Sequence, residues 1–342
     1  MSPHFLRPSP VLHSRAPIVP PDVPPEAAAA RLARGDTLRL VDHYGRGADI
    51  LDALDAELGP MPQLNGEALR KERRRRRTLA AGLLVPVTHD RVDLPGGGSF
   101  SLLTELYPDH HEFWLPLVEA RALHSSHRRF AEGVHFPVLG HRLHPWHGVY
   151  APHRSTHLEL FATWLSQHDG PRDHAIDVGT GCGVLAFMLA RSRFSRVTAT
   201  DVNPNAVHSV RLDVARHTPR PSIQVRQGDL LARTPQPADV IVFNPPWIPG
   251  AVDDPLDRAL YYDDDLFERF FMQARTALQP HGRVVVVFST VSQLLRPDLP
   301  HPIEAELSAG RFVLDAKLQR RVKASKGRRT RERVEIWVLA QA

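Results

Sequence analysis

Cysteine is almost absent from this chain of 342 residues, which contains only Cys182. An intrachain disulfide is therefore impossible, and the scarcity of cysteine favours a cytoplasmic location over a secreted one. No apolar run approaches the roughly 20 residues that a membrane-spanning helix needs. The N-terminal residues are interrupted by proline, histidine and arginine and lack the apolar core of a signal peptide. The sequence thus predicts a protein without a membrane segment.

Two common phosphate-binding loops are also missing. The glycines at 96–98 lack the Lys and Ser/Thr of a phosphate loop, and we interpret them as a turn. The glycines at 179–183 have the spacing GxGxG and not the GxGxxG of pyrophosphate binders. With 42% hydrophobic and 24% charged residues, the composition is that of a globular protein, and the length suffices for two domains.

The tetrapeptide Asn244-Pro245-Pro246-Trp247 follows an apolar run, Val240–Phe243, that is typical of a buried strand. The Asn carboxamide oxygen and the carbonyl beside a proline both accept hydrogen bonds, and proline restricts the backbone. A tryptophan ring can stack on a flat group. The tetrapeptide is therefore suited to a planar NH2 group, in a carboxamide or an exocyclic base amine, although Pro-Pro also occurs in ordinary loops.

A glycine-rich turn lies upstream, within Ala175–Gly183, between a short apolar strand and an apolar helix. Glycine permits a sharp bend and the close approach of a ligand, and the start of a helix offers unpaired N–H groups. Together with Asp177, the turn suits a ligand that has both an ammonium and a carboxylate, such as the methionine part of S-adenosylmethionine. Such turns also occur for packing alone, and we interpret Cys182 as a small packed residue rather than a nucleophile.

Polar residues also follow the next two predicted strands. Arg196–Asp201 ends in an acid, which at the second strand of a doubly wound sheet is placed to accept from ribose hydroxyls. Asn203 then begins a helix as its cap. The strand Ser222–Arg226 leads to Asp229, whose carboxylate can reach an adenine amine. Each acid alone has a plain alternative as a helix cap or surface residue, but four strand ends in the correct order favour one shared cofactor site.

The segments DVGTGCG, ATDVNPNAV, QGDLL and FNPPWIPG resemble, in order and approximate spacing, the class I S-adenosylmethionine-dependent methyltransferases. The likeness is greatest to the N-methyltransferases with an Asn-Pro-Pro-aromatic motif, and among them to the release-factor glutamine methyltransferase family. It covers roughly Arg128 to the C-terminus, because Arg129–Gly133 and Val149–Pro152 resemble the β-hairpin that precedes the catalytic domain in that family.

The chain departs from that family near the substrate site. Where the family has Pro-Arg-x-x-Thr-Glu, this chain has Pro152 and Thr156 in place, an arginine displaced by one to Arg154, and His157 instead of Glu. Trp247 stands where the family usually has Tyr. These changes bear on the substrate more than on methyl transfer.

The resemblance implies an α/β fold with a doubly wound, mostly parallel seven-stranded sheet, preceded by an N-terminal α+β accessory domain. It implies S-adenosylmethionine as cofactor, held by Asp177, Gly179, Thr180, Gly181, Gly183, Asp201, Val202, Asn203, Gly228, Asp229, Leu230 and Asn244. The expected catalytic residues are Asn244, Pro245, Pro246 and Trp247. The expected substrate rim comprises Pro152, Arg154, Thr156, Lys323, Lys326, Arg328 and Arg329.

The four basic residues of this rim belong to a C-terminal cluster. Residues 311–333 hold ten Lys/Arg against Asp315 and Glu332. Phe312–Val322 and Arg331–Leu339 are predicted as the last two strands, the first parallel to the Asn-Pro-Pro-Trp strand and the second antiparallel. Their connection should then lie at the sheet edge that holds the site. The cluster suits phosphates or an acidic partner, or it is a solvated hairpin.

The remaining segments predict the organisation of the chain. We expect residues 1–25 to form a Pro-rich tail, residues 26–145 a substrate-recognition domain and residues 146–342 the methyltransferase domain. The run Arg70–Arg77 is either a solvated helix face or a nucleic-acid contact. The segment Gly250–Asp265 is long for a strand-to-helix connection and is predicted to cover the substrate.

Three histidines, His141, His144 and His147, suggest a metal site at first sight. Pro145 interrupts any helix that would bring them together, and no cysteine is near, so we predict hydrogen-bonding roles and no metal. We also expect His153 or His157 to help position the substrate.

Four functions remain open on the sequence. The first is a protein N-methyltransferase acting on a glutamine amide, and the second is an RNA or DNA base N-methyltransferase. The third is a non-catalytic module that kept the fold, which the intact glycines, Asp201 and the Asn-Pro-Pro-Trp motif disfavour. A dehydrogenase is the fourth, and the GxGxG spacing disfavours it. The expected partner is a macromolecular substrate, protein or nucleic acid; the sequence does not indicate the oligomeric state.

Overall fold

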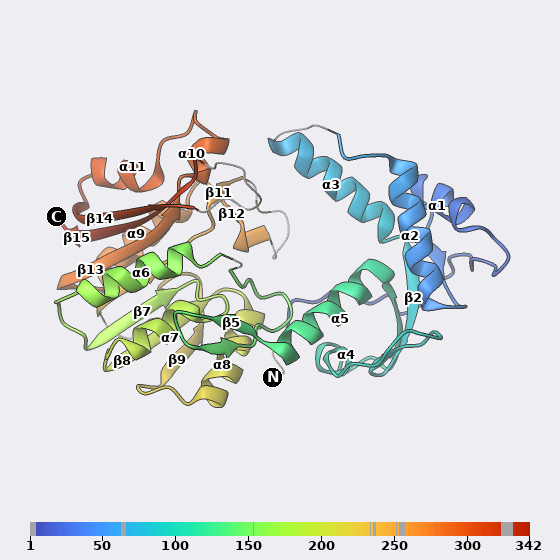
Figure 1. Ribbon diagram of the computed structural model, residues 1–342, viewed down its shortest axis with the longest axis horizontal. Coiled ribbons are helices and arrows are strands. Elements are labelled where there is room, and N and C mark those ends of the chain that lie inside the picture. Colours follow the sequence, from blue (N-terminus) through green and yellow to red (C-terminus); the bar gives the residue numbers. More distant parts are fainter. Residues whose placement is uncertain are drawn as a thin grey trace. The chain divides into compact units, whose positions relative to one another are not determined.

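The computed structural model describes residues 5–62, 66–152, 154–232, 234, 237–250, 252, 257–322 and 331–342. The chain divides into two compact units (Figure 1). One unit comprises Met1–Leu6 and Arg129–Ala342, and is called the catalytic unit below. The other comprises Arg7–Arg128 and is called the accessory unit.

The catalytic unit is built on one seven-stranded sheet of order β14-β15-β13-β10-β7-β8-β9. Its strands are β7 (His174–Val178), β8 (Arg196–Asp201), β9 (Ile223–Gln227), β10 (Ala238–Phe243), β13 (Leu278–Ser289), β14 (Phe312–Arg321) and β15 (Arg333–Gln341). Pairing is parallel from β13 to β9, and β15 is antiparallel to both of its neighbours. This order and these directions confirm the predicted doubly wound sheet, including the opposite senses of the last two strands.

Helices cover both faces of this sheet (Figure 1). The helices of the unit are α6 (Thr156–Gln167), α7 (Val184–Arg191), α8 (Pro204–His217), α9 (Leu266–Ala277), α10 (Val291–Leu295) and α11 (Pro302–Ser308), with a short helix η1 (Asp257–Ala259). Two small two-stranded ladders complete it: β5 (Val134–Phe136) with β6 (His141–Leu143), and β11 (Ile248–Pro249) with β12 (Tyr261–Tyr262). The parallel strands end at one edge of the sheet, where the order reverses between β7 and β10. That point is where open α/β sheets bind ligands.

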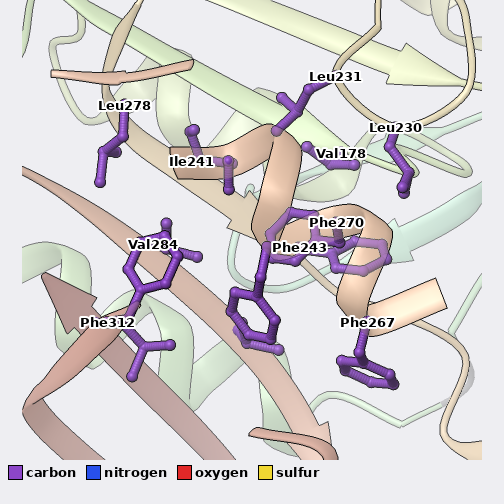
Figure 2. Packing of buried hydrophobic residues seen from close by; sticks show 14 of the residues in the cluster. Val178, Leu230, Leu231, Ile241, Phe243, Phe267, Phe270, Leu278, Val284 and Phe312 are labelled. Atoms are coloured by element: carbon purple, nitrogen blue, oxygen red, sulfur yellow. The ribbon is translucent and has the colours of Figure 1, made fainter. Parts of the chain in front are cut away.

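The register explains why one face of the central strands is apolar. Ile176 of β7 lies beside Ile241 of β10, and Ile241 lies beside Val284 of β13, so these three side chains point to the same face. Helix α9 adds Phe267, Phe270 and Phe271 to this core, as Figure 2 shows in part. The rings of Phe243 and Phe270 have centroids 4.4 Å apart. The end of β10, which carries the Asn-Pro-Pro-Trp motif, is therefore held by a packed aromatic cluster.

The accessory unit is a mixed α+β structure, as predicted. Its helices are α1 (Pro25–Ala33), α2 (Tyr44–Leu58), α3 (Gly66–Ala80) and α4 (Leu102–Leu106), and α5 (Leu117–Glu132) begins in it. Strand β2 (Leu83–Thr88) is central in a four-stranded sheet with β1 (Leu38–Arg39), β3 (Arg91–Val92) and β4 (Glu112–Pro116). The Pro-rich segment is extended but not a free tail, because Val19 is buried and Val11 pairs with Trp114 through two backbone hydrogen bonds.

The units divide between Arg128 and Arg129, earlier in the chain than the expected boundary at residues 145 and 146. The reason is that the segment after Arg128 packs on α8. The His144 amide donates to the carboxylate of Asp213, which is fully buried, over 2.7 Å. The Arg216 guanidinium lies over the Phe130 ring at 5.6 Å. The hairpin β5–β6 thus groups with the sheet, while the roles assigned to the two units stay predictions.

We predict that Phe270→Ala destabilises the catalytic unit by about 3–5 kcal/mol, because the fully buried ring leaves a cavity beside Phe243. Met272→Ala on the same helix is the matched control. Its side chain is 53% exposed, so the change should stay within about 0.5 kcal/mol. Urea unfolding of the full chain, followed by tryptophan fluorescence, measures both; equal midpoints for the two variants would contradict the packing described.

Candidate active site at the carboxyl edge of the sheet

A cavity of about 750 Å³ opens at the carboxyl ends of the parallel strands. Most of the residues predicted for cofactor, catalysis and rim line it. They are Gly179, Thr180, Gly181, Asp201, Val202, Asn203, Gly228, Asp229, Leu230, Asn244, Pro245, Pro246, Trp247, Pro152, Arg154 and Thr156. Asp177 and Gly183 are absent from the lining. Lys323, Lys326, Arg328 and Arg329 lie outside the described residues, as does His153.

Asp177 supports the glycine turn from below. Its side chain is buried, and its Oδ2 accepts from the Thr180 hydroxyl at 2.6 Å and from the Ala186 amide at 3.0 Å. One carboxylate oxygen thus joins the end of β7, the turn and the first turn of α7. Gly183 acts in packing: its φ is +84°, and a Cβ there would lie 3.0 Å from Val210.

The Asp177 carboxylate under this turn is the candidate acceptor for the ammonium of the methionine part of S-adenosylmethionine. Among the described residues, the second carboxylate oxygen of Asp177 is buried without a hydrogen-bond partner, directly under the turn whose residues Gly179, Thr180 and Gly181 line the cavity. Gly181 has a φ of +54°, and a Cβ there would lie 3.4 Å from the Tyr150 carbonyl, in the space beside the cavity. Burial raises the pKa of Asp177 to about 7; hydrogen bonds from Thr180 and Ala186 oppose the rise, and the Asp201 charge adds to it.

Asp201 fixes the geometry at the end of β8. Its Oδ2 accepts from the Gly181 amide at 2.9 Å, and its Oδ1 accepts from the Asn203 amide at 2.8 Å. Burial raises the pKa of its carboxyl, while these backbone bonds lower it. The Asn203 side chain in turn accepts from the Asn205 amide and caps α8, as predicted. Contact of Asp201 with ribose hydroxyls stays a prediction.

Asp229, after β9, is oriented by α9. Arg269 donates to its Oδ2 at 2.6 Å. The neighbouring Val202 side chain is 41% exposed although it is apolar, and it faces the same cavity as Leu230. An apolar wall beside an oriented carboxylate is what a base with an exocyclic amine requires.

The Asn-Pro-Pro-Trp loop follows β10 directly. The Trp247 indole Nε1 donates to Asn244 Oδ1 at 3.2 Å and to the Val287 carbonyl at 3.3 Å. The indole therefore holds the Asn244 carboxamide in one orientation, with its oxygen toward the indole. A carbonyl oxygen has two lone pairs, so Asn244 Oδ1 can accept a second hydrogen bond from a substrate.

His157 lies against this loop. Its ring is perpendicular to that of Trp247, with centroids 5.6 Å apart, and its side chain is only 3% exposed. Burial lowers the pKa of His157 to about 4. The position that holds a carboxylate in the resembling family therefore holds a neutral imidazole at pH 7, and the site has one negative charge fewer.

The segment after the loop also faces the cavity. Strand β11 pairs with β12, and Val252, Arg258 and Tyr261 line the cavity. The Tyr262 hydroxyl and the Ser292 hydroxyl are 3.0 Å apart, which ties this segment to α10. Cover of the substrate by this segment stays a prediction; Asp253 and Asp254 lie outside the described residues.

The described part of the rim is a small polar network. Arg154 forms an ion pair with Glu332 at 2.8 Å, and the Ser289 hydroxyl donates to the same carboxylate at 2.9 Å. Val322 and Glu332, on either side of the undescribed connection, both line the cavity. Glu332 is a site residue that the sequence alone did not reveal.

The junction histidines serve different contacts. His144 Nδ1 lies 2.7 Å from the Phe130 carbonyl, and the His141 ring lies 4.3 Å from that of His217. In the ranges that the structure describes, no three His, Cys, Asp or Glu side chains are arranged to hold a metal ion. Nor does any described helix combine the length and apolar character needed to cross a bilayer.

Strand order, glycine turn and cavity define a class I methyltransferase domain, the fold of the S-adenosylmethionine-dependent methyltransferases. Residues 143–296 match the family model described as the methyltransferase small domain.

Several curated proteins are similar to parts of this chain. Ribosomal protein L11 methyltransferase of Geobacillus kaustophilus is 42% identical over 80 residues, which are 23% of this chain and 26% of that protein. The tRNA1(Val) (adenine(37)-N6)-methyltransferase of Bacteroides thetaiotaomicron is 28% identical over 42% of this chain and 63% of that protein. A Methanocaldococcus jannaschii protein with the provisional name protein N5-glutamine methyltransferase is 25% identical over 44% of this chain and 76% of its own length.

Among solved structures, ribosomal protein L11 methylase of Lactobacillus delbrueckii subsp. bulgaricus has a TM-score of 0.40 at 20% identity, over 56% of this chain and 81% of that one. The chain spans about a quarter of the length of the L11 methyltransferase and less than two thirds of the tRNA enzyme.

We predict that affinity for S-adenosylhomocysteine, the demethylated cofactor, falls about tenfold per pH unit below about 7. The raised pKa means that Asp177 becomes protonated there and loses its attraction for the ligand ammonium. Calorimetry between pH 5 and 7.5 measures this. Asp177→Asn should bind weakly at every pH; a variant that kept the wild-type slope would contradict the assignment.

Proposed function

We propose that this protein is an S-adenosylmethionine-dependent N-methyltransferase that acts on a planar NH2 group of a macromolecule. The observation that carries the proposal is the meeting of two motifs in one cavity. The glycine turn after β7 and the Asn244–Trp247 loop after β10 lie on adjacent strands and line the same space. One motif suits the donor and the other suits a flat amine.

The residues of the chain supply orientation rather than acid–base chemistry. When bound, S-adenosylmethionine supplies a methyl group that is already activated on a sulfonium. Asn244 Oδ1 and the Pro245 carbonyl accept the two N–H groups of the substrate, which directs the nitrogen lone pair toward the donor side of the cavity. The same two oxygens stabilise the positive charge that develops on nitrogen.

No side chain is required to remove a proton before transfer. With the donor bound, the substrate nitrogen would take the methyl group as its bond to sulfur breaks, and the methylated nitrogen would release its proton afterwards to water. His157 agrees with this scheme, because burial keeps it neutral near pH 7 and it adds no charge beside the loop.

The leading substrate is a glutamine side-chain amide of a protein. The loop Asn244–Pro249 supports it, since its Ile248 and Pro249 follow the pattern of the glutamine-modifying family. The Methanocaldococcus jannaschii relative, with its provisional N5-glutamine name, agrees with this choice.

A nucleic-acid base amine is the second candidate. Aromatic rings favour it, because Trp247, Tyr261 and Tyr262 line the cavity together with Asn244, and aromatic side chains stack on bases. The relative named for N6-methylation of adenine agrees with this alternative.

Labelled S-adenosylmethionine distinguishes the two candidates. The protein is incubated with the labelled donor and a cell lysate, and the product is digested separately with protease and nuclease. Label released by protease supports the glutamine amide, and label released by nuclease supports the base. Incorporation into neither, under conditions in which the protein binds the donor, would refute both substrates.

We predict that Asn244→Ala lowers the turnover number by about 100-fold or more, while affinity for S-adenosylhomocysteine changes only modestly, because the lost contact is to the reacting nitrogen. Kinetics with the fraction of the lysate that accepts the labelled methyl group measure the turnover number. Calorimetry measures the affinity for S-adenosylhomocysteine. Met272→Ala, at an exposed side chain that does not line the cavity, is the control outside the loop and should keep both quantities. Turnover near the wild-type value in Asn244→Ala would end the assigned role.

A further inference from the structure

Helix α3 of the accessory unit has an unusual concentration of positive charge. Between Arg70 and Arg77 every residue is Lys or Arg except Glu72. Like charges three or four positions apart on a helix repel each other and cost a few tenths of a kcal/mol per pair. A surface that served solubility alone would intersperse both signs. The helix therefore bears a cost that local stability does not explain.

One arginine of the run serves the fold. Arg76 donates to the Leu58 carbonyl at 2.9 Å and to the Gly59 carbonyl at 2.8 Å, at the end of α2, and also pairs with Glu72. Its side chain is 11% exposed. A cation at the C-terminal end of a helix stabilises the orphan carbonyls there. This contact also fixes the rotation of α3 about its axis.

With Arg76 turned inward, five of the other basic residues of the run are exposed, and Arg70 is partly buried. Exposed residues of the run are Lys71, Arg73, Arg74, Arg75 and Arg77. Ion pairs of the run include Glu72 with Arg75 and Arg76, Asp55 with Arg76, and Glu119 with Arg77. The run itself holds seven Lys/Arg and one Glu, so positive charge exceeds negative charge along it.

We propose that this outer face of α3 binds the phosphate backbone of a nucleic acid. Arginine dominates the run, and its planar fork matches phosphate oxygens better than lysine does. A protein partner would need apolar or aromatic anchors, and the exposed residues of the run include none. From Arg70 to Arg77 the helix rises about 10 Å, enough to face several phosphates. This surface goes beyond methyl transfer and is independent of it.

The test is the binding of a labelled mixed-sequence RNA oligonucleotide to the full chain at several salt concentrations. The triple variant Lys71→Gln, Arg73→Gln, Arg74→Gln should bind at least about tenfold more weakly. The slope of log K against log salt should fall by about 2, because each phosphate contact contributes about 0.7 on a single strand.

Two controls separate binding from folding and from net charge. Arg15→Gln, Arg34→Gln, Arg91→Gln removes the same charge from exposed sites of the same unit and should keep the wild-type slope. Arg76→Gln should lower the stability of the unit yet keep most of the slope. Equal slopes for the α3 triple variant and the wild type would overturn the proposal. The proposal would also be overturned if polyglutamate displaced the labelled RNA as effectively as unlabelled RNA does, because that result would indicate an acidic protein partner. S-adenosylhomocysteine affinity, measured in parallel, should not change.

A second inference concerns the first described residues, Phe5 and Leu6, which belong to the catalytic unit. The Leu6 amide donates to Asn205 Oδ1, and Asn205 Nδ2 donates to the Leu6 carbonyl, each at 2.8 Å. Asn205 is fully buried, so this pair is shielded from water. The Phe5 ring packs with centroids 4.5 Å from Trp146 and 4.9 Å from His208.

The anchored Leu6 lines the cavity together with Val202 and Pro204, next to the end of β8. We infer that Leu6 is a wall for the adenosyl part of the cofactor, which rests on the proposed function. An apolar side chain beside the exposed Val202 excludes water from a ligand ring. The role is one of binding and not of chemistry.

Leu6→Asp should weaken S-adenosylhomocysteine binding at least about tenfold by calorimetry, since it places a charge in an apolar wall. Leu12→Asp, at a side chain 48% exposed, is the matched control and should bind normally. If Leu6→Asp does not fold, Leu6→Ala replaces it and should show a smaller loss of S-adenosylhomocysteine affinity.

Normal binding by a folded Leu6 variant would overturn the inference about Leu6 but not the proposed function. No binding by the unsubstituted chain would instead refute the proposed function, and this inference with it.

Discussion

The site depends on one requirement, that the parallel strands β7, β8 and β10 end at the same level. Their register provides this, because Val178 at the end of β7 lies beside both Thr200 and Phe243. The buried Asp177 carboxylate then turns the chain from β7 into α7 by accepting from Thr180 and Ala186. Asp201 reaches the same turn from the next strand. This half of the cavity, the proposed site of the methyl donor, is therefore preorganised by backbone and carboxylate contacts.

The other half, the proposed site of the methyl acceptor, is formed at the end of β10 in the same sheet. Phe243 is packed in the aromatic core of α9, and the residue after it, Asn244, leaves the strand at the cavity. Trp247 closes the loop by donating to Asn244 and to the carbonyl of Val287 on β13. A tyrosine at position 247 would place its hydroxyl at a different distance from the Asn244 carboxamide than the indole Nε1 of Trp247. The presence of Trp instead of Tyr therefore alters how the carboxamide is held.

Much of this was predictable, because short-range patterns carry it. The β8 bounds, the glycine turn and the Asn203 cap follow from apolar runs and capping residues that are adjacent in sequence. Long-range contacts were not predictable. Leu6 meets Asn205 across nearly two hundred residues, and no pattern in a Pro-rich segment signals that pair. The neutrality of His157 depends on burial between α6 and the loop, which a single sequence does not reveal.

Strand β14 forms one border of the large sheet, and it is ten residues long. A border strand of that length is a template for unwanted pairing between molecules. The ladder to β15 is irregular between Leu314 and Ala316, and the far end of the strand exposes Arg320 and Arg321. Irregular pairing and repelling charges are recognised defences against aggregation. Arg320 and Arg321 thus have a consequence for solubility that does not depend on any role in binding a ligand.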